Sequence, residues 1–323
     1  MKNIKWGMIG CGDVTEVKSG PAFNKIPNSS LHAVMSRSEG KAKDYAERHG
    51  VPNYYASVNQ LLDDPEVNAI YIATPPSTHK LFALQALQNS LPVYMEKPMC
   101  MNAVEARELV TAVEAGTTKF SVAHYRRGQP KFLKVKSLLA ENAIGKVKSI
   151  TLQLSRVPLN ATDLEVPKTA WRIDPAIAGG GLFHDLAPHQ LDLMLFFFGD
   201  ALQVSGTSSN QNLLYTVPDI IEASIVFGQG INFKGLWNFF DGADEDRIVI
   251  TGDIGSIEFS AFEKNELILT KGAEVEIISF GHLSHVQQPM IELVVKYFLG
   301  DGPNPCSVQE AAIVTEWMDR ITN

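Results

Sequence analysis

The sequence predicts an α/β protein with two domains: an N-terminal doubly wound parallel sheet over residues 1–123, and a C-terminal α+β domain over residues 124–323 with a mostly antiparallel sheet. Three observations predict this class. The N-terminal third alternates short apolar runs with helices of about 10–15 residues, a pattern typical of a parallel sheet covered on both faces. From Lys146 onward, strand-like runs follow one another at short intervals. A length of 323 residues also fits two domains of ~150 residues each.

Composition restricts the class of protein further. A hydrophobic content of 45% and a charged content of 20% are ordinary for a globular enzyme. A net charge of -8 and a pI near 5.5 argue against a general nucleic-acid or membrane-surface binder. No signal-peptide core and no run of ~20 apolar residues is visible, so we expect a cytoplasmic location. Cys11, Cys100 and Cys306 lack metal-site and disulfide spacing, so no metal is expected.

In the N-terminal third, strands are expected at 4–9, 31–35, 69–73 and 93–95, and helices at 39–49, from Ser77 onward and from Asn102 to Gly116. Gly50 is the expected C′ residue of helix 39–49. Asn102 and Glu105 form a start that resembles a capping box. The helix after Ser77 is expected to carry Leu81, Leu84 and Leu87 on one stripe.

The first strand ends in a glycine-rich turn, Gly10-Cys11-Gly12-Asp13-Val14-Thr15. Two glycines of a G-x-G-x-x-G motif are present, and they allow a tight turn and close approach of the backbone to a phosphate. Thr15 takes the third place, which mainly governs how closely helix and strand pack. A lone Gly-x-Gly can also be an ordinary strand–helix turn. Its position at the first strand of a βαβ unit favours a pyrophosphate site formed by Gly10, Gly12, Asp13 and Val14.

The end of the second strand predicts which dinucleotide binds. An NAD-selective site usually has an acidic residue there to bind the ribose 2′-hydroxyl. This chain has Ser36-Arg37-Ser38 instead. Two hydroxyls and a guanidinium suit a 2′-phosphate, because arginine offers a bidentate fork to phosphate oxygens. A surface arginine beside an N-cap serine is the competing interpretation. We expect NADP(H) to be preferred, with NAD(H) possible.

The second half predicts a succession of strands at 150–154, 220–227, 231–240, 247–251, 256–260, 266–270 and 275–278. Turns such as Gly228-Gln229-Gly230 separate them, as in an antiparallel meander. Alternation within 220–227 suggests that Ile221, Ala223, Ile225 and Phe227 face helices. A final helix over about 307–321 is expected to pack on the first domain.

Four motifs occur in one order along the chain: Gly10-x-Gly12, Ala73-Thr74-Pro75-Pro76-Ser77-Thr78-His79, Glu96-Lys97-Pro98, and Gly179-Gly180-Gly181-x-x-x-Asp185-x-x-x-His189. In this order the chain resembles the Gfo/Idh/MocA oxidoreductases, the relatives of glucose–fructose oxidoreductase and inositol dehydrogenase. The resemblance covers essentially the whole chain. It implies a Rossmann domain, a second domain with a large open sheet, and hydride exchange between NAD(P) and a sugar, cyclitol or related polyol.

The resemblance also implies roles for individual residues. Lys97 matches the family's catalytic lysine, and Asp185 and His189 match its acid/base pair. Glu96 and Pro98 match the segment that positions this lysine near the nicotinamide. The expected cofactor contacts are then Thr74, Pro75, His79, Glu96, Lys97, Trp171 and Arg172. Thr15 departs from the pattern, as does Pro188, which lacks an N–H, so that the helix should begin late or bend there.

The chemistry of alcohol oxidation suits these residue types. A proton must leave oxygen as hydride leaves carbon, and a positioned base contributes roughly 10²–10⁴-fold. Histidine, with an ordinary pKa of about 6.5, suits that role. Asp185 lies four residues before His189, so on a helix the two side chains face the same way. Lys97 would stabilise the developing alkoxide.

Each candidate also has a structural interpretation. Lys97 would be a solvated lysine after a strand, Asp185 the N-cap of a helix 186–198, and His189 a satisfied core histidine. For His184 the structural interpretation is preferred. Trp171 is either core or a lid over the cofactor, and Tyr125-Arg126-Arg127 is either a cleft wall or a solvated basic turn. Gly179-Gly180-Gly181 either lets the backbone approach a ligand or forms a flexible loop.

Substrate and partners are predicted only as classes. Asn160, Asp163, Lys168 and Arg172, in the segment 156–183, are candidates to bind substrate hydroxyls. The resemblance implies pairing of the C-terminal sheets as a homodimer or homotetramer. The same catalytic set would serve a glycosidase that oxidises and re-reduces its sugar. The alternative from another class is a cofactor-sensing protein without catalysis. Because a sensor needs only the Rossmann half, the presence of Lys97, Asp185 and His189 together argues against it.

Overall fold

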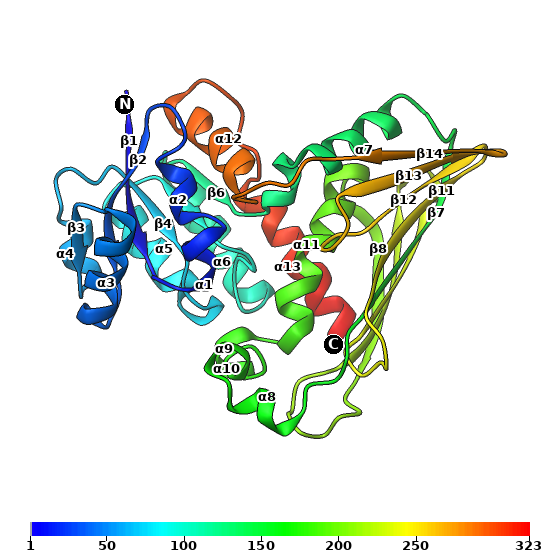
Figure 1. The fold of residues 1–323 in the computed structure, drawn as a ribbon, viewed down its shortest axis with the longest axis horizontal. Coiled ribbons are helices and arrows are strands. Elements are labelled where there is room, and N and C mark those ends of the chain that lie inside the picture. Colours follow the sequence, from blue (N-terminus) through cyan, green and yellow to red (C-terminus); the bar gives the residue numbers. More distant parts are fainter. Residues whose placement is uncertain (1) are drawn as a thin grey trace. The chain divides into compact units, whose positions relative to one another are not determined.

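The computed structural model describes residues 2–323 and divides the chain into two compact units (Figure 1). The first unit runs to Gln129 and takes up residues Leu283–Ala312, and the second comprises Pro130–His282 and Ile313–Asn323. The predicted boundary near residue 123 left 283–312 in the second domain. The structure differs because helix α12 (Gln288–Leu299) buries Met290, Ile291 and Val294 in the same core as Trp6 of the first strand.

A six-stranded sheet in the order β3-β2-β1-β4-β5-β6 organises the first unit, and all of its pairings are parallel. Its strands are β1 (Ile4–Ile9), β2 (Ser29–Met35), β3 (Asn53–Tyr55), β4 (Ala69–Ile72), β5 (Val93–Met95) and β6 (Phe120–Val122). The central strands β1 and β4 are almost entirely buried, as expected for a parallel sheet covered on both faces. The predicted doubly wound sheet is confirmed.

Short helices connect these strands: α1 (Asp13–Val17), α2 (Gly20–Phe23), α3 (Glu39–His49), α4 (Val58–Leu62), η1 (Pro76–Thr78), α5 (His79–Gln88), α6 (Ala103–Glu114) and η2 (Tyr125–Gly128). Gly50 ends α3 in the left-handed region at φ 64°, and Asn102 caps α6 by accepting the Glu105 N–H at 3.0 Å. Of the predicted stripe on α5, Leu84 and Leu87 are partly buried against the core, whereas Leu81 is 54% exposed; the fully buried residues of this helix are His79, Ala83 and Ala86.

The second unit is built on an eight-stranded sheet in the order β14-β13-β12-β11-β7-β10-β9-β8. Its strands are β7 (Val147–Ser155), β8 (Ala201–Ser209), β9 (Ile220–Phe227), β10 (Asn232–Asn238), β11 (Glu245–Gly252), β12 (Gly255–Phe259), β13 (Glu266–Lys271) and β14 (Glu274–Ser279). Only β7 and β10 pair in parallel. The mostly antiparallel sheet is confirmed, although β8 was not predicted.

Helices cover one face of this sheet (Figure 1). They include α7 (Pro130–Ala140), α11 (Gly181–Phe198) and the part of α13 (Val308–Thr322) from Ile313 onward. The short elements are α8 (Ala161–Glu165), α9 (Pro167–Ala170), α10 (Pro175–Ala178) and η3 (Gly228–Gly230). Ile221, Ala223, Ile225 and Phe227 are buried as predicted. Because the division falls within α13, only its first residues belong to the first unit. No helix in residues 2–323 is long and apolar enough to cross a membrane.

Candidate active site

The turn after β1 is held in a shape that suits close approach of a ligand. Gly10 has a φ of 104°, and a Cβ there would lie 2.6 Å from the Ala73 carbonyl oxygen, so only glycine fits. At Gly12 a Cβ would meet nothing within 4 Å, which leaves that side of the turn open. Thr15 is fully buried and donates its hydroxyl to the Gly12 carbonyl at 2.7 Å. A small polar residue therefore takes the place of the third glycine.

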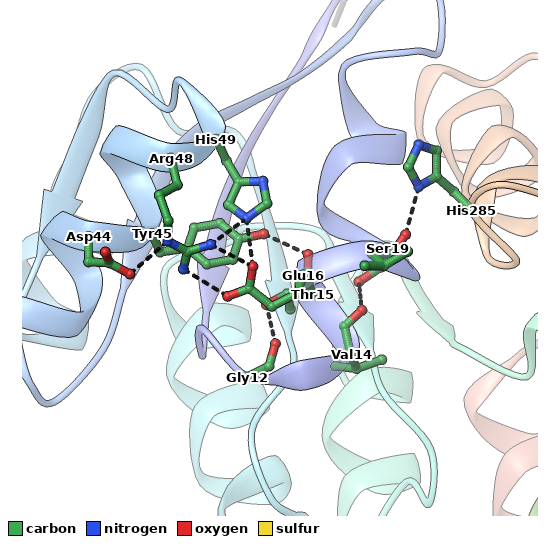
Figure 2. A network of polar contacts seen from close by, with 11 residues as sticks. Gly12, Val14, Thr15, Glu16, Ser19, Asp44, Tyr45, Arg48, His49 and His285 are labelled. Carbon is green, nitrogen blue, oxygen red and sulfur yellow. Dashed lines mark hydrogen bonds and ion pairs between the residues drawn. The ribbon is translucent and has the colours of Figure 1, made fainter.

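A polar network fixes helix α1, which follows this turn, against α3 (Figure 2). Glu16 accepts two hydrogen bonds from the Arg48 guanidinium, at 2.8 and 2.9 Å, and lies 2.8 Å from His49 Nε2. The Arg48 hydrogen bond lowers the pKa of Glu16 to about 2, with His49 contributing. Tyr45 donates its hydroxyl to the Thr15 carbonyl at 2.7 Å. The backbone just behind the turn is thus held by several charge-assisted and buried hydrogen bonds.

The segment after β2 carries one exposed arginine, Arg37. Arg37 is exposed and makes no hydrogen bond or ion pair within residues 2–323. Ser38 occupies the N-cap of α3 with extended backbone, but its side chain makes no capping hydrogen bond. The Ser36 hydroxyl oxygen lies 3.4 Å from the Ser38 amide nitrogen. These polar groups stand at the N-terminus of an eleven-residue helix, where anions are favoured.

The loop after β4 is braced from within by His79. This side chain is fully buried, with Nε2 2.8 Å from the Thr74 carbonyl oxygen and Nδ1 2.9 Å from the Pro98 carbonyl oxygen. Burial lowers its pKa. Thr74 and Pro75 are half-buried, and Thr78 donates to the Thr74 hydroxyl at 2.8 Å. His79 is predicted to contact the cofactor, and in the structure its buried side chain braces two loops.

Glu96, Lys97 and Pro98 follow directly on β5. Glu96 extends the strand by donating its N–H to the Ile72 carbonyl at 2.9 Å, and its side chain is buried. Its Oε1 accepts hydrogen bonds from the Tyr71 hydroxyl at 2.6 Å and the Gln287 amide at 2.7 Å. Burial raises the pKa of Glu96 despite these donors. The Lys97–Pro98 peptide bond is cis, and Lys97 is half-buried.

The basic turn after β6 is neither solvated nor open. Tyr125, Arg126 and Arg127 are all buried within η2. Arg127 donates to Glu310 at 2.5 Å and to the Pro305 carbonyl at 3.3 Å. Because its guanidinium pairs inside the first unit, Arg127 has a structural role there. The interpretation of this turn as solvated is wrong.

In the second unit, the segment before α11 is organised by its own polar residues. Asn160 and Asp163 form a capping box for α8, in which the Asn160 side chain accepts two backbone N–H groups and Asp163 accepts the Asn160 N–H. This occupies two of the side chains predicted to bind substrate hydroxyls. The Arg172 guanidinium lies 4.4 Å from the centre of the Trp171 ring. It also donates to the Lys168 carbonyl, which fixes the arginine over the short helix α9.

The structure brings Arg172 and Asp185 together. Arg172 Nε donates to Asp185 Oδ2 at 2.9 Å, with about a quarter of each side chain exposed. Helix α11 begins at Gly181 with Gly180 as its N-cap, so Asp185 is not the N-cap of this helix. Of the late start or bend predicted at Pro188, the late start is wrong, since Pro188 lies inside the helix. His189 follows one turn after Asp185, is buried, and meets Phe262 edge-on at 5.7 Å between ring centres.

The three glycines 179–181, at the start of α11, serve packing and backbone geometry. Gly179 and Gly181 have φ values of 85° and 70°. A Cβ on Gly180 would lie 1.9 Å from His184 Nδ1, so the imidazole rests directly on that glycine. His184 is 7% exposed, and burial lowers its pKa to about 4. His184 is thus a neutral packing residue at pH 7, in agreement with its structural interpretation.

Sequence reasoning missed one residue beside the candidate lysine. Gln287 lies 191 positions after Glu96 in the chain and is fully buried against it. It precedes the amphipathic helix α12 in a segment of ordinary composition, so no local pattern distinguishes it. Only the return of the chain to the first unit reveals this contact.

Comparison with known proteins identifies the family. A family model described as "Oxidoreductase family, NAD-binding Rossmann fold" matches residues 4–124, and the "GFO/IDH/MocA C-terminal domain" model matches residues 132–258. The chain is 46% identical over 316 residues to "Oxidoreductase P35" of Formosa agariphila, covering 98% of this chain and 97% of that protein. It is 30% identical over 293 residues to a trans-1,2-dihydrobenzene-1,2-diol dehydrogenase of Xenopus laevis, covering 88% and 83%.

Solved structures agree on the fold. Levoglucosan dehydrogenase in complex with NADH and levoglucosan has a TM-score of 0.89 at 20% identity, covering 99% of this chain and 96% of that one. KijD10, a 3-ketoreductase from Actinomadura kijaniata in complex with NADP and TDP-benzene, has a TM-score of 0.84 at 18% identity, covering 99% and 97%. With both domain models and a near full-length relative matched, the chain belongs to the Gfo/Idh/MocA family of oxidoreductases with an NAD-binding Rossmann fold.

Proposed function

We propose that this oxidoreductase transfers a hydride between the nicotinamide C4 of NADP(H) and a hydroxyl-bearing carbon of a sugar, cyclitol or related polyol. The observation that supports this most directly is the Asp185–His189 pair on one face of α11. Asp185 lies a full turn inside the helix and pairs with Arg172, so its carboxylate does not cap the N-terminus of α11. The names of relatives that act on sugars and diols support the substrate class.

The residues of the first unit fit a dinucleotide. Gly10 and Gly12 allow the backbone to approach a pyrophosphate, because no side chain occupies the open side of the turn. Asp13 and Val14 follow in the same turn. Thr74 and Pro75 are half-buried in the loop braced by His79, where they are available to line the cofactor. A bound nicotinamide supplies the hydride acceptor or donor at its C4.

The preference for NADP(H) depends on Arg37. Its guanidinium is exposed and unpaired within residues 2–323, beside the Ser36 and Ser38 hydroxyls at the N-terminus of α3. A 2′-phosphate would receive charge-assisted hydrogen bonds there, whereas a 2′-hydroxyl would leave the cation without an anionic partner. Solved relatives contain either NADP or NADH, so the fold accommodates both.

In this proposal, residues of the Glu96-Lys97-Pro98 and Asp185-x-x-x-His189 motifs carry out proton transfer. Lys97 donates a hydrogen bond to the reacting oxygen and stabilises the negative charge that develops on it. His189 accepts the hydroxyl proton in the oxidative direction and returns it in the reductive direction. Asp185 orients the reacting group or the imidazole, and Arg172 holds the Asp185 carboxylate in place through their ion pair. Trp171 and Arg172 belong to the segment assigned to the nicotinamide end of the cofactor.

The second sheet is the proposed interface of a homodimer or homotetramer. Leu236, Val249 and Ile268 alternate with the buried positions of their strands, so they lie on the face that the helices leave uncovered. Ile277 is 60% exposed and is paired in register with Ile268. Light scattering at micromolar concentration should give two or four times the chain mass of 35.5 kDa. A monomer would contradict this part of the proposal.

The function is tested by absorbance at 340 nm with NADP and then NAD, over a panel of aldoses, inositols and ketoses. Turnover of at least one polyol class, faster with NADP at equal concentration, is expected. Cofactor binding without net turnover of any compound in the panel would contradict the dehydrogenase proposal. Lys43→Ala, which changes a lysine on the exposed face of α3, serves as the surface control.

A further inference from the structure

We propose that Gln287 is a positioning residue: its amide donates to the Glu96 carboxyl group beside Lys97, holds it in place and favours its ionised form for the proposed reaction. This inference rests on the proposed role of Lys97, and it adds a residue that no motif of the chain indicated. It is argued from contacts within the first unit alone.

Gln287 is held in place by its own backbone and has one side-chain function. It is fully buried, and its N–H donates to the Lys18 carbonyl at 3.2 Å, just after α1. Its side-chain Nε2 donates to Glu96 Oε1 at 2.7 Å. Its Oε1 is also buried and receives no hydrogen bond within residues 2–323. The Gln287 amide therefore hydrogen-bonds Glu96 through its N–H, while its oxygen is buried without a hydrogen-bond partner in the described part of the chain. Burying that unpaired oxygen costs free energy.

The Glu96 carboxylate is the meeting point of a hydrogen-bond chain. The Tyr71 hydroxyl donates to the same Oε1 at 2.6 Å. Ser19 Oγ lies 3.0 Å from the Tyr71 oxygen and 3.2 Å from the Val14 carbonyl oxygen, so its single proton can serve one of these two contacts. Figure 2 shows Val14 in the first turn of α1, close to Gly12, and Ser19 just beyond the end of this helix. Close contacts between polar groups thus connect Val14, in the helix after the glycine turn, with Glu96, the residue that precedes Lys97.

The charges and titratable groups around Glu96 come from several elements. Tyr71 lies on β4, Tyr94 on β5, Lys97 on the following segment, and Lys18 after α1. Burial raises the pKa of Glu96, whereas the Tyr71 and Gln287 hydrogen bonds and the two lysines oppose that rise. Removal of the Gln287 donor should therefore make Glu96 easier to protonate. Protonation removes the negative charge next to Lys97.

The first arm of the test uses the cofactor-free protein. Carbon-13 NMR of labelled glutamate carboxyls, with Glu96 assigned by its loss in Glu96→Gln, follows the titration of this one group. In Gln287→Met, which keeps the volume and removes the donor, the Glu96 midpoint should rise by about 1 pH unit. Tyr71→Phe removes the other donor to the same oxygen and should also raise it. His285→Ala is the matched control, because His285 binds the Val17 carbonyl from the same segment without touching Glu96.

The second arm is the pH profile of kcat. In Gln287→Met the acid limb should move to higher pH by a similar amount while KM stays within about twofold, and His285→Ala should leave the limb in place. In the Glu96→Gln background, Gln287→Met should produce no further displacement. An unchanged Glu96 midpoint in both donor variants overturns the inference, as does a shifted midpoint with an unmoved profile. Failure of the proposed function can be told apart from failure of this inference. In that case the wild type shows no turnover, but the NMR titration of Glu96 can still be measured.

Discussion

Gly180→Ala tests whether the glycines before α11 are required by packing. A Cβ at this position would lie 1.9 Å from Nδ1 and 2.1 Å from Cε1 of His184, whereas contacts under 3.0 Å are essentially never found. The ring is 7% exposed and cannot swing freely into solvent, so neighbouring atoms must shift. Overpacking of this kind costs about 1–3 kcal/mol. We expect that loss in the free energy of unfolding, measured with urea at pH 7.

Two controls make the interpretation specific. Gly242→Ala places a methyl group where nothing lies within 4 Å, so its stability should stay within about 0.5 kcal/mol of the wild type. In a His184→Ala background the ring is absent, and Gly180→Ala should then cost at least ~1 kcal/mol less than it does alone. Equal destabilisation with and without His184 would refute the reasoning, as would a Gly180→Ala protein as stable as Gly242→Ala.

Three further predictions concern the cofactor end and acid stability. Arg37→Ala should weaken NADPH binding about 10–100-fold, because a charge-assisted hydrogen bond contributes about 1.5–3 kcal/mol. The affinity for NADH, measured in the same way by nicotinamide fluorescence, should change little. Equal losses of affinity for NADPH and NADH would contradict this prediction. Glu16→Gln should lose about 1 kcal/mol of unfolding free energy at pH 7 after allowance for solvent exposure. Since the ion pair with Arg48 lowers the pKa of Glu16 to about 2, it stabilises the fold only while Glu16 is ionised. The difference between wild type and Glu16→Gln should therefore vanish as the pH falls from 4.5 to about 2. Because folding lowers the pKa of His184 from 6.5 to about 4, protonation of this histidine favours the unfolded state. As the pH falls from 6.5 to 4, the free energy of unfolding of the wild type should therefore decrease by about 3 kcal/mol more than that of His184→Asn. Parallel curves of unfolding free energy against pH, measured with urea, would contradict this.

Local patterns predicted the elements whose stabilisation is local. Helix α3 has the predicted limits, because Ser38 and Gly50 mark its ends in the sequence. Strand β9 also has the predicted limits, since its alternation follows burial on one face. Strand β8 was missed because it is an edge strand of small and polar residues, mostly exposed, that pairs only with β9. Its structure depends on the neighbouring strand rather than on its own side chains.

The candidate site shows the same division between local and long-range information. Lys97, Asp185 and His189 stand in short motifs, so the sequence indicated them as candidates. The start of α11 at Gly181 was not predictable from Pro188, because helix packing overrides the local cost of a proline. Gln287 reaches Glu96 across 191 residues of chain, and the Arg172–Asp185 pair depends on how 160–180 folds back. Those contacts require the tertiary structure.

The most direct test of the proposed chemistry is to measure kcat and the cofactor Kd together for Lys97→Ala, with Lys43→Ala as the control. If Lys97 stabilises charge on the reacting oxygen, kcat should fall roughly 10²–10⁴-fold while the Kd for NADPH changes only a few-fold. A variant that keeps wild-type kcat, or one that loses turnover only because it no longer binds NADPH, would contradict the assignment of Lys97.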